Sequence, residues 1–266
     1  MGSEMCIRDS NKAKKGGRSY YPLFCTVAQT GQFFDVLHRP GNVHDSNGAD
    51  QFMMQCFDQL QHQLKGTTFE SRMDSAFFSQ TVLTIIGANH VKFTASVPFE
   101  RFTELKAMIE QRKRWRRIDD EWSYFETNWK PKSWDTAYRF IFTRRKTKKQ
   151  RKGLLQLDLF EPRDFNYDYK VVVTNKSESA KSVILFHNGR GSQEAIFADA
   201  KNDCGLNVIP TRRLIGNQVY TLCSMMAPNL SRELQMISAP AASRAKSKRP
   251  TAWQFTTLDA LRHRII

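Results

Sequence analysis

The sequence predicts an α/β fold, a mixed sheet flanked by helices, with a β-rich segment inserted into it. Two observations predict this class. Over residues 11–117, segments in which every second side chain is apolar alternate with segments of helical spacing. From about residue 118 to 175 the period of two prevails, and helical spacing returns after it. Alternating strands and helices are typical of sheets whose faces are covered by helices.

The first part of the chain predicts a hairpin, a helix, a strand, a helix and a strand, in that order. Turn residues separate these segments, and Ser46, Asn47 and Gly48 offer a helix cap. The expected elements are a hairpin over 20–38, a helix from about 49 to Leu64, a strand over 68–73 that ends at Asp74, a helix around 78–85 and a strand over 91–97.

The second part predicts one more helix before the β-rich segment and two helices after it. A linker then precedes an amphipathic end. The expected elements are a helix over 100–115, strands at 122–124, 138–142 and 170–174, a projecting basic loop over 144–152, helices over 192–202 and 217–234, a linker over 239–248 and an amphipathic segment over 253–266.

The charge of the chain favours a polyanionic partner. Forty-one Lys and Arg against 26 Asp and Glu leave a formal net charge of +15. Basic side chains concentrate in the runs 112–117 and 144–152, where they could contact phosphates and release counterions. A run of this kind also fits a solvated surface, and a merely basic protein fits the same composition.

Cysteine and histidine usage argues against a disulfide scaffold and a zinc site. The five cysteines are widely spaced without a CxxC pair, which fits free thiols in a reducing cytoplasm. His38 and His44 lack neighbouring ligands for zinc. No apolar run approaches the roughly 20 residues that span a bilayer.

The two ends of the chain lack the features of natural ends. Residues 1–10 have no periodicity and resemble a translated sequencing adapter, so they are excluded from fold reasoning. We expect the natural sequence to continue upstream of Asn11. The last residues, Ile265 and Ile266, follow an amphipathic segment without a cap, so we expect that end to be cut short as well.

The pattern His187-x2-Arg190-x3-Glu194-x6-Lys201 carries the chemistry. On a continuous helix, these steps would place Arg190, Glu194 and Lys201 along one stripe. A carboxylate between two cations suits a metal ligand beside phosphate-binding groups. An exposed helix with an ordinary Arg and Glu pair fits the spacing too. Two glycines beside Arg190 also allow it to lie on an approach loop, with Ser192 capping the helix.

The stretch 186–201 resembles the YREK signature of the DDE transposases of bacterial insertion sequences, with His187 in the place of the tyrosine. Residues 69–77 resemble the strand end that carries the family's second catalytic Asp, which falls on Asp74. Residues 39–49 are similar to the family's connection from hairpin to first helix, and residues 227–232 to the helix after the Glu helix. The resemblance covers residues 17 to about 261.

The resemblance implies a ribonuclease-H-like core in which three carboxylates hold two Mg²⁺ ions, for which Mn²⁺ can substitute. Asp74 and Glu194 would be catalytic residues and metal ligands, while Arg190, Lys201 and His187 would bind DNA phosphates. Carboxylates suit this role because hard divalent cations prefer oxygen ligands. Tryptophans 122, 129 and 134 could stack on an unpaired base, although such residues are more often sheet core.

The first catalytic Asp of the family has no match in this sequence. Asp9 lies in the adapter-like stretch and Asp35 on the second strand of the hairpin. The expected division of the chain is an adapter-derived segment over 1–10, a first core part without its first strand over 11–117, an inserted subdomain over 118–175, a second core part over 176–238, and a basic linker with a truncated end over 239–266.

Three hypotheses follow. The first is a transposase that nicks and joins double-stranded DNA at terminal inverted repeats and in target DNA, as a homodimer in the bacterial cytoplasm and nucleoid, although this chain alone would be inactive. The second is a non-catalytic DNA-binding remnant. The third is a structural α+β protein with an accidental YREK spacing. The sequence upstream of Asn11 distinguishes the first two, because a strand carrying an Asp there would restore the enzyme.

Overall fold

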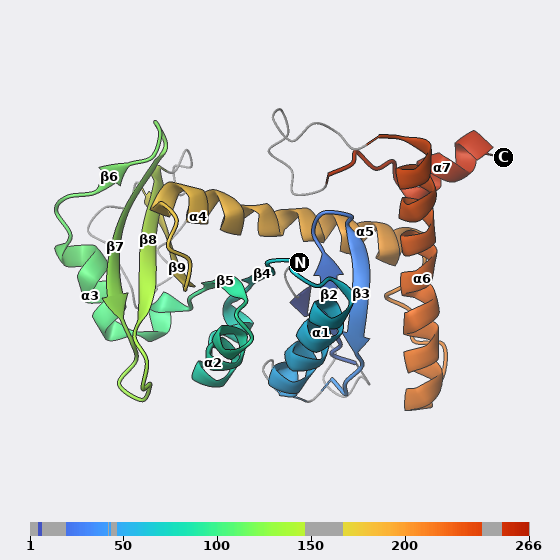
Figure 1. Ribbon diagram of the computed structural model, residues 1–266, viewed down its shortest axis with the longest axis horizontal. Helices are drawn as coiled ribbons and strands as arrows, with labels where there is room; N and C mark the ends of the chain where they lie inside the picture. The colour runs from blue at the N-terminus through green and yellow to red at the C-terminus, as the bar shows by residue number, and fades with distance from the viewer. Residues whose placement is uncertain are drawn as a thin grey trace, which may run out of the picture.

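The computed structural model describes residues 5–6, 20–41, 43, 47–146, 167–240 and 252–265. Their strands form two sheets (Figure 1). The first, in the order β1-β2-β3, comprises Met5–Cys6, Leu23–Val27 and Gln32–Leu37. The second, in the order β4-β5-β9-β8-β7-β6, comprises Glu70–Met73, Lys92–Ser96, Tyr167–Thr174, Tyr138–Lys146, Trp122–Trp129 and Arg116–Arg117.

Seven α-helices accompany the two sheets in the part of the chain that is described. They are α1 Ala49–Gln63, α2 Gln80–Ala88, α3 Thr103–Gln111, α4 Ala180–Asn188, α5 Ser192–Asp203, α6 Leu214–Ser238 and α7 Leu258–Ile265. Three 3₁₀ turns, η1 Ser75–Phe77, η2 Phe99–Arg101 and η3 Gly189–Gly191, join some of them to their neighbours. Among the described helices, none is long and apolar enough to cross a membrane.

The six-stranded sheet is mixed. Strand β5 pairs in parallel with β4 and antiparallel with β9, and β6 to β9 pair antiparallel with one another. The strands of residues 118–175 therefore continue the sheet that β4 and β5 begin. This confirms the predicted α/β class with a mixed sheet between helices, and it is consistent with a ribonuclease-H-like fold. The division into core and inserted subdomain stays a prediction.

Helices cover both faces of this sheet because successive strand residues point to opposite sides. On β8, Phe140 and Phe142 join the large core formed with α1, α2 and α3. Ile141, between them, packs instead against Val183 and Ile184 of α4. The sheet is therefore one layer between two layers of helix.

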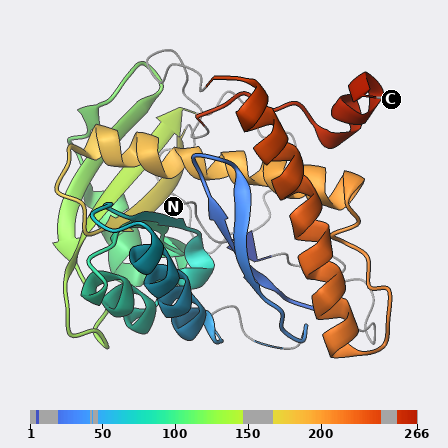
Figure 2. The ribbon, with the colours of Figure 1, turned by 45° about the vertical axis from the view of Figure 1, so that its right-hand side comes forward.

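Helices α4 and α5, joined by η3, form one long arm that crosses both sheets (Figures 1 and 2). At its far end Phe197 of α5 packs edge-on against Phe24 and Phe33 of the hairpin, with ring centroids 5.2 Å and 5.4 Å apart. Burial of three aromatic rings fixes α5 on the β2–β3 hairpin.

Most predicted elements are confirmed within a few residues, with three differences. Helix α3 ends at Gln111 rather than near Trp115, because Trp115 turns back to pack on Phe125. Strand β8 runs to Lys146, so the basic loop begins later than expected, and residues 147–152 lie outside the described part. Helix α4 is absent from the predicted elements. Residues 241–248 of the predicted linker also lie outside the description.

Helix α6 is attached to the hairpin and to α5 through polar side chains. Asn229 accepts a hydrogen bond from the Phe33 amide at 2.8 Å and donates one to the Phe33 carbonyl at 2.7 Å. Arg232, which is buried, lies 3.5 Å from Asp199 of α5, and its guanidinium lies 4.6 Å from the ring centroid of Phe255. Asn229 and Arg232 thus join α6 to the hairpin, to α5 and to the segment that carries Phe255.

Burial outweighs attraction in the Asp199–Arg232 pair. It raises the pKa of Asp199 despite the nearby guanidinium, and it lowers the pKa of Arg232. Both shifts reflect the loss of water around a charged group, so the pair contributes little stability relative to apolar side chains of similar size. Removing only one partner would leave the other charge buried without compensation.

We predict that Asp199→Ala lowers the free energy of unfolding by roughly 1–3 kcal/mol, because it leaves the buried Arg232 charge without its acid. The side chain of Asp199 is 24% exposed, which keeps the loss below that of a fully buried pair. The double variant Asp199→Leu with Arg232→Met should stay within about 1 kcal/mol of the original chain, since apolar side chains can replace such a pair. Urea unfolding followed by circular dichroism measures both. An Asp199→Ala variant as stable as the original would contradict the prediction.

Candidate active site

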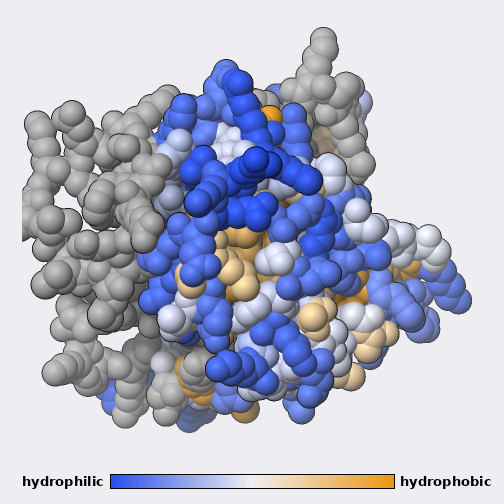
Figure 3. Space-filling model, turned by 90° about the vertical axis from the view of Figure 1, so that its left-hand side faces the viewer, coloured by the Kyte–Doolittle hydropathy of each residue, from blue (hydrophilic) through white to orange (hydrophobic). Residues whose placement is uncertain are grey.

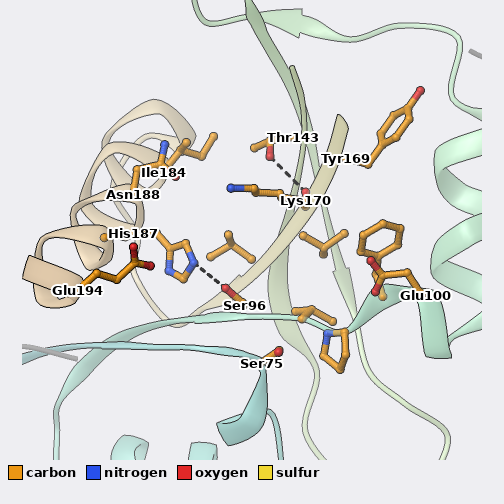
Figure 4. Close-up of a pocket in the computed structure, with 16 residues that line it drawn as sticks. Ser75, Ser96, Glu100, Thr143, Tyr169, Lys170, Ile184, His187, Asn188 and Glu194 are labelled. Carbon is orange, nitrogen blue, oxygen red and sulfur yellow. Dashed lines mark hydrogen bonds between the residues drawn. The ribbon is translucent and has the colours of Figure 1, made fainter. Parts of the chain in front are cut away.

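A cavity of about 460 Å³ lies between the α4–α5 arm and the strands β5, β8 and β9 (Figure 4). Its lining combines carboxylates, hydroxyls, an amine and an imidazole with apolar strand residues. The polar side chains are those of Ser75, Ser96, Glu100, Thr143, Tyr169, Lys170, His187, Asn188 and Glu194. Such a mixture can bind a charged ligand while apolar walls reduce its contact with water.

Glu194 lies in the first turn of α5 and extends to the cavity from the arm. Its side chain is exposed, whereas its neighbour Gln193 is buried and donates a hydrogen bond to the Thr26 hydroxyl at 2.8 Å. Phe197, which packs on the hairpin, follows Glu194 by about one helical turn. Because Gln193 and Phe197 both face the hairpin, they orient the start of α5 and with it the carboxylate of Glu194.

Asp74 follows the last residue of β4 and begins the turn η1. Its side chain accepts a hydrogen bond from the amide of Ala76 at 2.9 Å. The cavity is lined by the adjacent Ser75 rather than by Asp74 itself. The strand end that carries Asp74 and the helix start that carries Glu194 thus approach the same cavity.

His187 connects α4 to β5 at the floor of the cavity. The residue is 7% exposed. One ring nitrogen lies 2.9 Å from the Ser96 hydroxyl and the other 3.0 Å from the Thr94 hydroxyl (Figure 4). These two contacts hold α4 against the sheet. Binding of a phosphate by this ring would have to replace one of them, so the phosphate-binding role stays a prediction.

The two predicted cations differ in how they lie. Arg190 belongs to η3, between the two helices, and its side chain lies outside the described part of the chain. Lys201 lies half-buried in the last turn of α5 and does not line the cavity. Ser192 is the first residue of α5, and Gly191 rather than Ser192 is its N-cap. Helix α5 therefore starts after Arg190, which lies in a 3₁₀ turn rather than on a loop capped by Ser192.

Several lining residues have no signal in the sequence. Lys170 extends from β9 across the cavity toward α4, while Glu100 faces it from the opposite side (Figure 4). Thr143 donates a hydrogen bond to the carbonyl of Lys170 at 3.2 Å. The sequence marks Lys170 only as the beginning of a strand. Its position on β9, paired with β8, places the ammonium group of Lys170 in the cavity, where it could bind an anion.

The residues present fit a divalent cation in part. Asp74 and Glu194 supply carboxylate oxygens, the ligand type that Mg²⁺ prefers. One Asp74 oxygen is already bonded to the Ala76 amide. Within the described residues, no group of three or more His, Cys, Asp and Glu side chains is close enough to hold a metal. These two carboxylates could therefore be only part of a complete set of ligands.

A basic surface rich in aromatic rings lies along β6, β7 and β8. The guanidinium of Arg144 lies 4.7 Å from the ring centroid of Trp115 and 4.4 Å from that of Tyr167, and Arg145 lies 5.6 Å from that of Trp122. Hydrophilic side chains cover much of the described face on this side of the molecule (Figure 3). Of the three tryptophans that could stack on a base, Trp129 and Trp134 pack instead among core residues.

We predict that His187→Phe lowers the free energy of unfolding by about 1–3 kcal/mol, because it leaves the fully buried Thr94 hydroxyl without this partner. Adding Thr94→Val should recover part of this loss, since no buried hydroxyl is then orphaned. Urea denaturation of the single and double variants provides the comparison. Equal stability of the His187→Phe variant and the original chain would show that these contacts contribute nothing.

The comparisons with known proteins identify the family of the chain. A search of curated proteins finds no match. The family model described as transposase DDE domain group 1 matches residues 10–265, which is nearly the whole chain. The match confirms the resemblance inferred from the motifs around Asp74 and Glu194. The chain therefore belongs to the family of DDE-domain transposases, group 1.

Proposed function

We propose that the chain forms the part of a transposase that binds, nicks and joins DNA at the terminal inverted repeats of a mobile element. One observation carries the proposal: Ser75, the residue after Asp74, and Glu194 at the start of α5 line the same polar cavity. Transposases act on DNA, and the net charge of +15 suits a polyanionic substrate. In this proposal the protein acts on nucleoid DNA in the bacterial cytoplasm and bridges two DNA ends as a homodimer.

Asp74 and Glu194 would bind the metal ions, Mg²⁺ or in its place Mn²⁺. The bound ions would supply an activated water or 3′-hydroxyl and neutralise charge on the phosphate. Lys170, Arg190 and Lys201 would hold DNA phosphates by charge. His187, fixed by Ser96 and Thr94, would define the floor on which the DNA backbone rests.

The chemistry needs a third carboxylate beside these two. The described residues bring no third acid into a cluster with Asp74 and Glu194. This observation favours a second candidate, a DNA-binding remnant that retains the basic surface but does not cut. In this second candidate the present sequence binds DNA without cleaving it, whereas in the first an Asp from sequence upstream of Asn11 completes the ligand set and restores cleavage.

We predict metal-dependent nicking when the chain is extended upstream of Asn11 from its genomic sequence and given DNA that carries the end of the element. Asp74→Ala and Glu194→Ala should reduce nicking to background, because each removes a carboxylate ligand. Glu110→Ala, an exposed acid on α3, is the matched control and should cleave normally. Cleavage is measured on labelled DNA with Mg²⁺, with Mn²⁺ and without metal. Binding without cleavage in every version would support the remnant.

We predict that the basic run after α3 contacts DNA phosphates. All three of Lys113, Arg114 and Arg116 have exposed side chains. Replacing them with Gln should weaken DNA binding and make the slope of log Kd against log salt shallower by about 0.9 for each phosphate that the variant no longer neutralises. Fluorescence anisotropy at several salt concentrations gives the slope.

A charge-matched control separates direct binding from net charge. Lys65, Lys92 and Arg213 are also exposed but lie outside both basic runs. Their replacement with Gln lowers the net charge by the same amount and should leave the salt slope close to its original value. If both triple variants change the slope equally, the run after α3 is not a specific DNA-binding surface.

A further inference from the structure

Helix α6 turns its more apolar face to solvent. Its buried residues are mostly polar or small, namely Asn217, Thr221, Ser224, Met225, Pro228, Ser231 and Arg232. Its outer face carries large apolar side chains that are between 41% and 77% exposed, namely Ile215, Val219, Leu222, Met226, Leu230, Leu234 and Ile237. A surface helix that packs on its own core only normally shows the opposite arrangement.

The outer side chains form one stripe, which the exposed Glu233 interrupts near its C-terminal end, where it accepts a hydrogen bond from Gln32. They follow each other at steps of three or four residues, which keeps them within an arc of about 120° on a helix with 3.6 residues per turn. From Ile215 to Ile237 the stripe is about 33 Å long at a rise of 1.5 Å per residue. A monomer seldom exposes so large an apolar patch.

The size of the stripe suits a protein interface. Seven large apolar side chains, each between 41% and 77% exposed, present on the order of several hundred Å² to solvent. This approaches the roughly 800 Å² that each partner buries in a standard stable interface. A facing helix with the same stripe would cover it along its full length.

The charge pattern selects the partner. Of the 25 residues of α6, only Arg232 and Glu233 are charged, and Arg232 is buried against Asp199. A helix face without an exposed cation offers nothing to DNA phosphates. Two copies of a chain with a net charge of +15 repel each other over most of their surfaces. Along α6 they meet mainly through apolar side chains, and the one exposed charge there, Glu233, is acidic and adds no repulsion between cations.

The position of α6 leaves the candidate active site accessible. It lies at one end of the molecule, whereas β6, β7 and α3 lie at the other end (Figures 1 and 2). Pairing through α6 would therefore place two cavities and two basic surfaces away from the interface.

We propose that the outer face of α6 binds α6 of a second copy of this chain, and that the resulting dimer forms without DNA. This interface does not depend on the proposed DNA chemistry. Cys223, an exposed free thiol, lies within the arc of the stripe, next to Leu222 and one turn before Met226 and Ala227. In a dimer built on the middle of α6, the two Cys223 thiols come within reach of a short bifunctional reagent.

The test is the oligomeric state of the full chain in the absence of DNA, by sedimentation velocity at micromolar concentration. The expected result is a dimer that persists at high salt, because apolar contacts are not screened. Met226→Lys and Leu230→Lys should raise the dimer dissociation constant at least about tenfold, since each places a charge in the apolar interface. Leu185→Lys is the matched control: Leu185 on α4 is 61% exposed, as Leu230 is 60% exposed, and its replacement should leave the dimer intact.

A second measurement does not require a destabilising change. A short bismaleimide should cross-link two copies of the original chain, and Cys223→Ser should abolish the cross-linked product. Circular dichroism and thermal unfolding establish that the lysine variants are folded.

A folded but monomeric original chain would overturn the proposal. A dimer that neither lysine variant weakens would overturn it as well. DNA affinity is measured on the same samples. Its loss would count against the proposed function and leave the dimer interface unaffected.

Discussion

The packing of Phe197 against Phe24 and Phe33 is the interaction on which the candidate site depends. It fixes one end of the α4–α5 arm on the hairpin, while His187 fixes the other part of the arm on β5. Glu194 lies between these two attachments. Because the arm crosses both sheets, the carboxylate can face the cavity only while both attachments hold. The site is thus a property of how two sheets are joined, rather than of any single loop.

Much of the fold could be predicted because strands such as β2 are short apolar runs between turn residues, and because helices such as α1 bury one face at helical spacing. The order of these elements along the chain follows from the two signals. Helix α4 was missing from the predicted elements although its buried residues Ala180, Val183, Ile184 and His187 have helical spacing and Ser179 caps it, so the sequence does carry its signal. The end of β8 could not be predicted because Arg144 and Arg145 look like loop residues, whereas their stacking on Trp115 and Trp122 lets them extend a strand.

The candidate site was predictable where a residue type and a spacing carry the chemistry, as for Glu194 and for Asp74 at a strand end. The match to the DDE-domain family confirms the resemblance on which those assignments rest, while the roles of the individual residues stay proposals. Lys170 could not be predicted, because its relevance arises from strand pairing with β8 and not from its neighbours in sequence. The stripe on α6 was likewise hidden, since the sequence shows an apolar helix but not which side of it faces water.

The attachments between the hairpin and the last third of the chain also govern when the protein can fold. The hydrogen bonds from Gln193 to Thr26, from Phe33 to Asn229 and from Asn217 to Tyr20 join residues 167, 196 and 197 positions apart. At synthesis rates of about 5–20 residues per second, the hairpin waits roughly ten to forty seconds for its partners to leave the ribosome. During this interval Phe24 and Phe33 lack the helix that covers them. Slow translation of the middle third would prolong this exposure, so the newly made chain gains from rapid synthesis or from a chaperone that covers the hairpin.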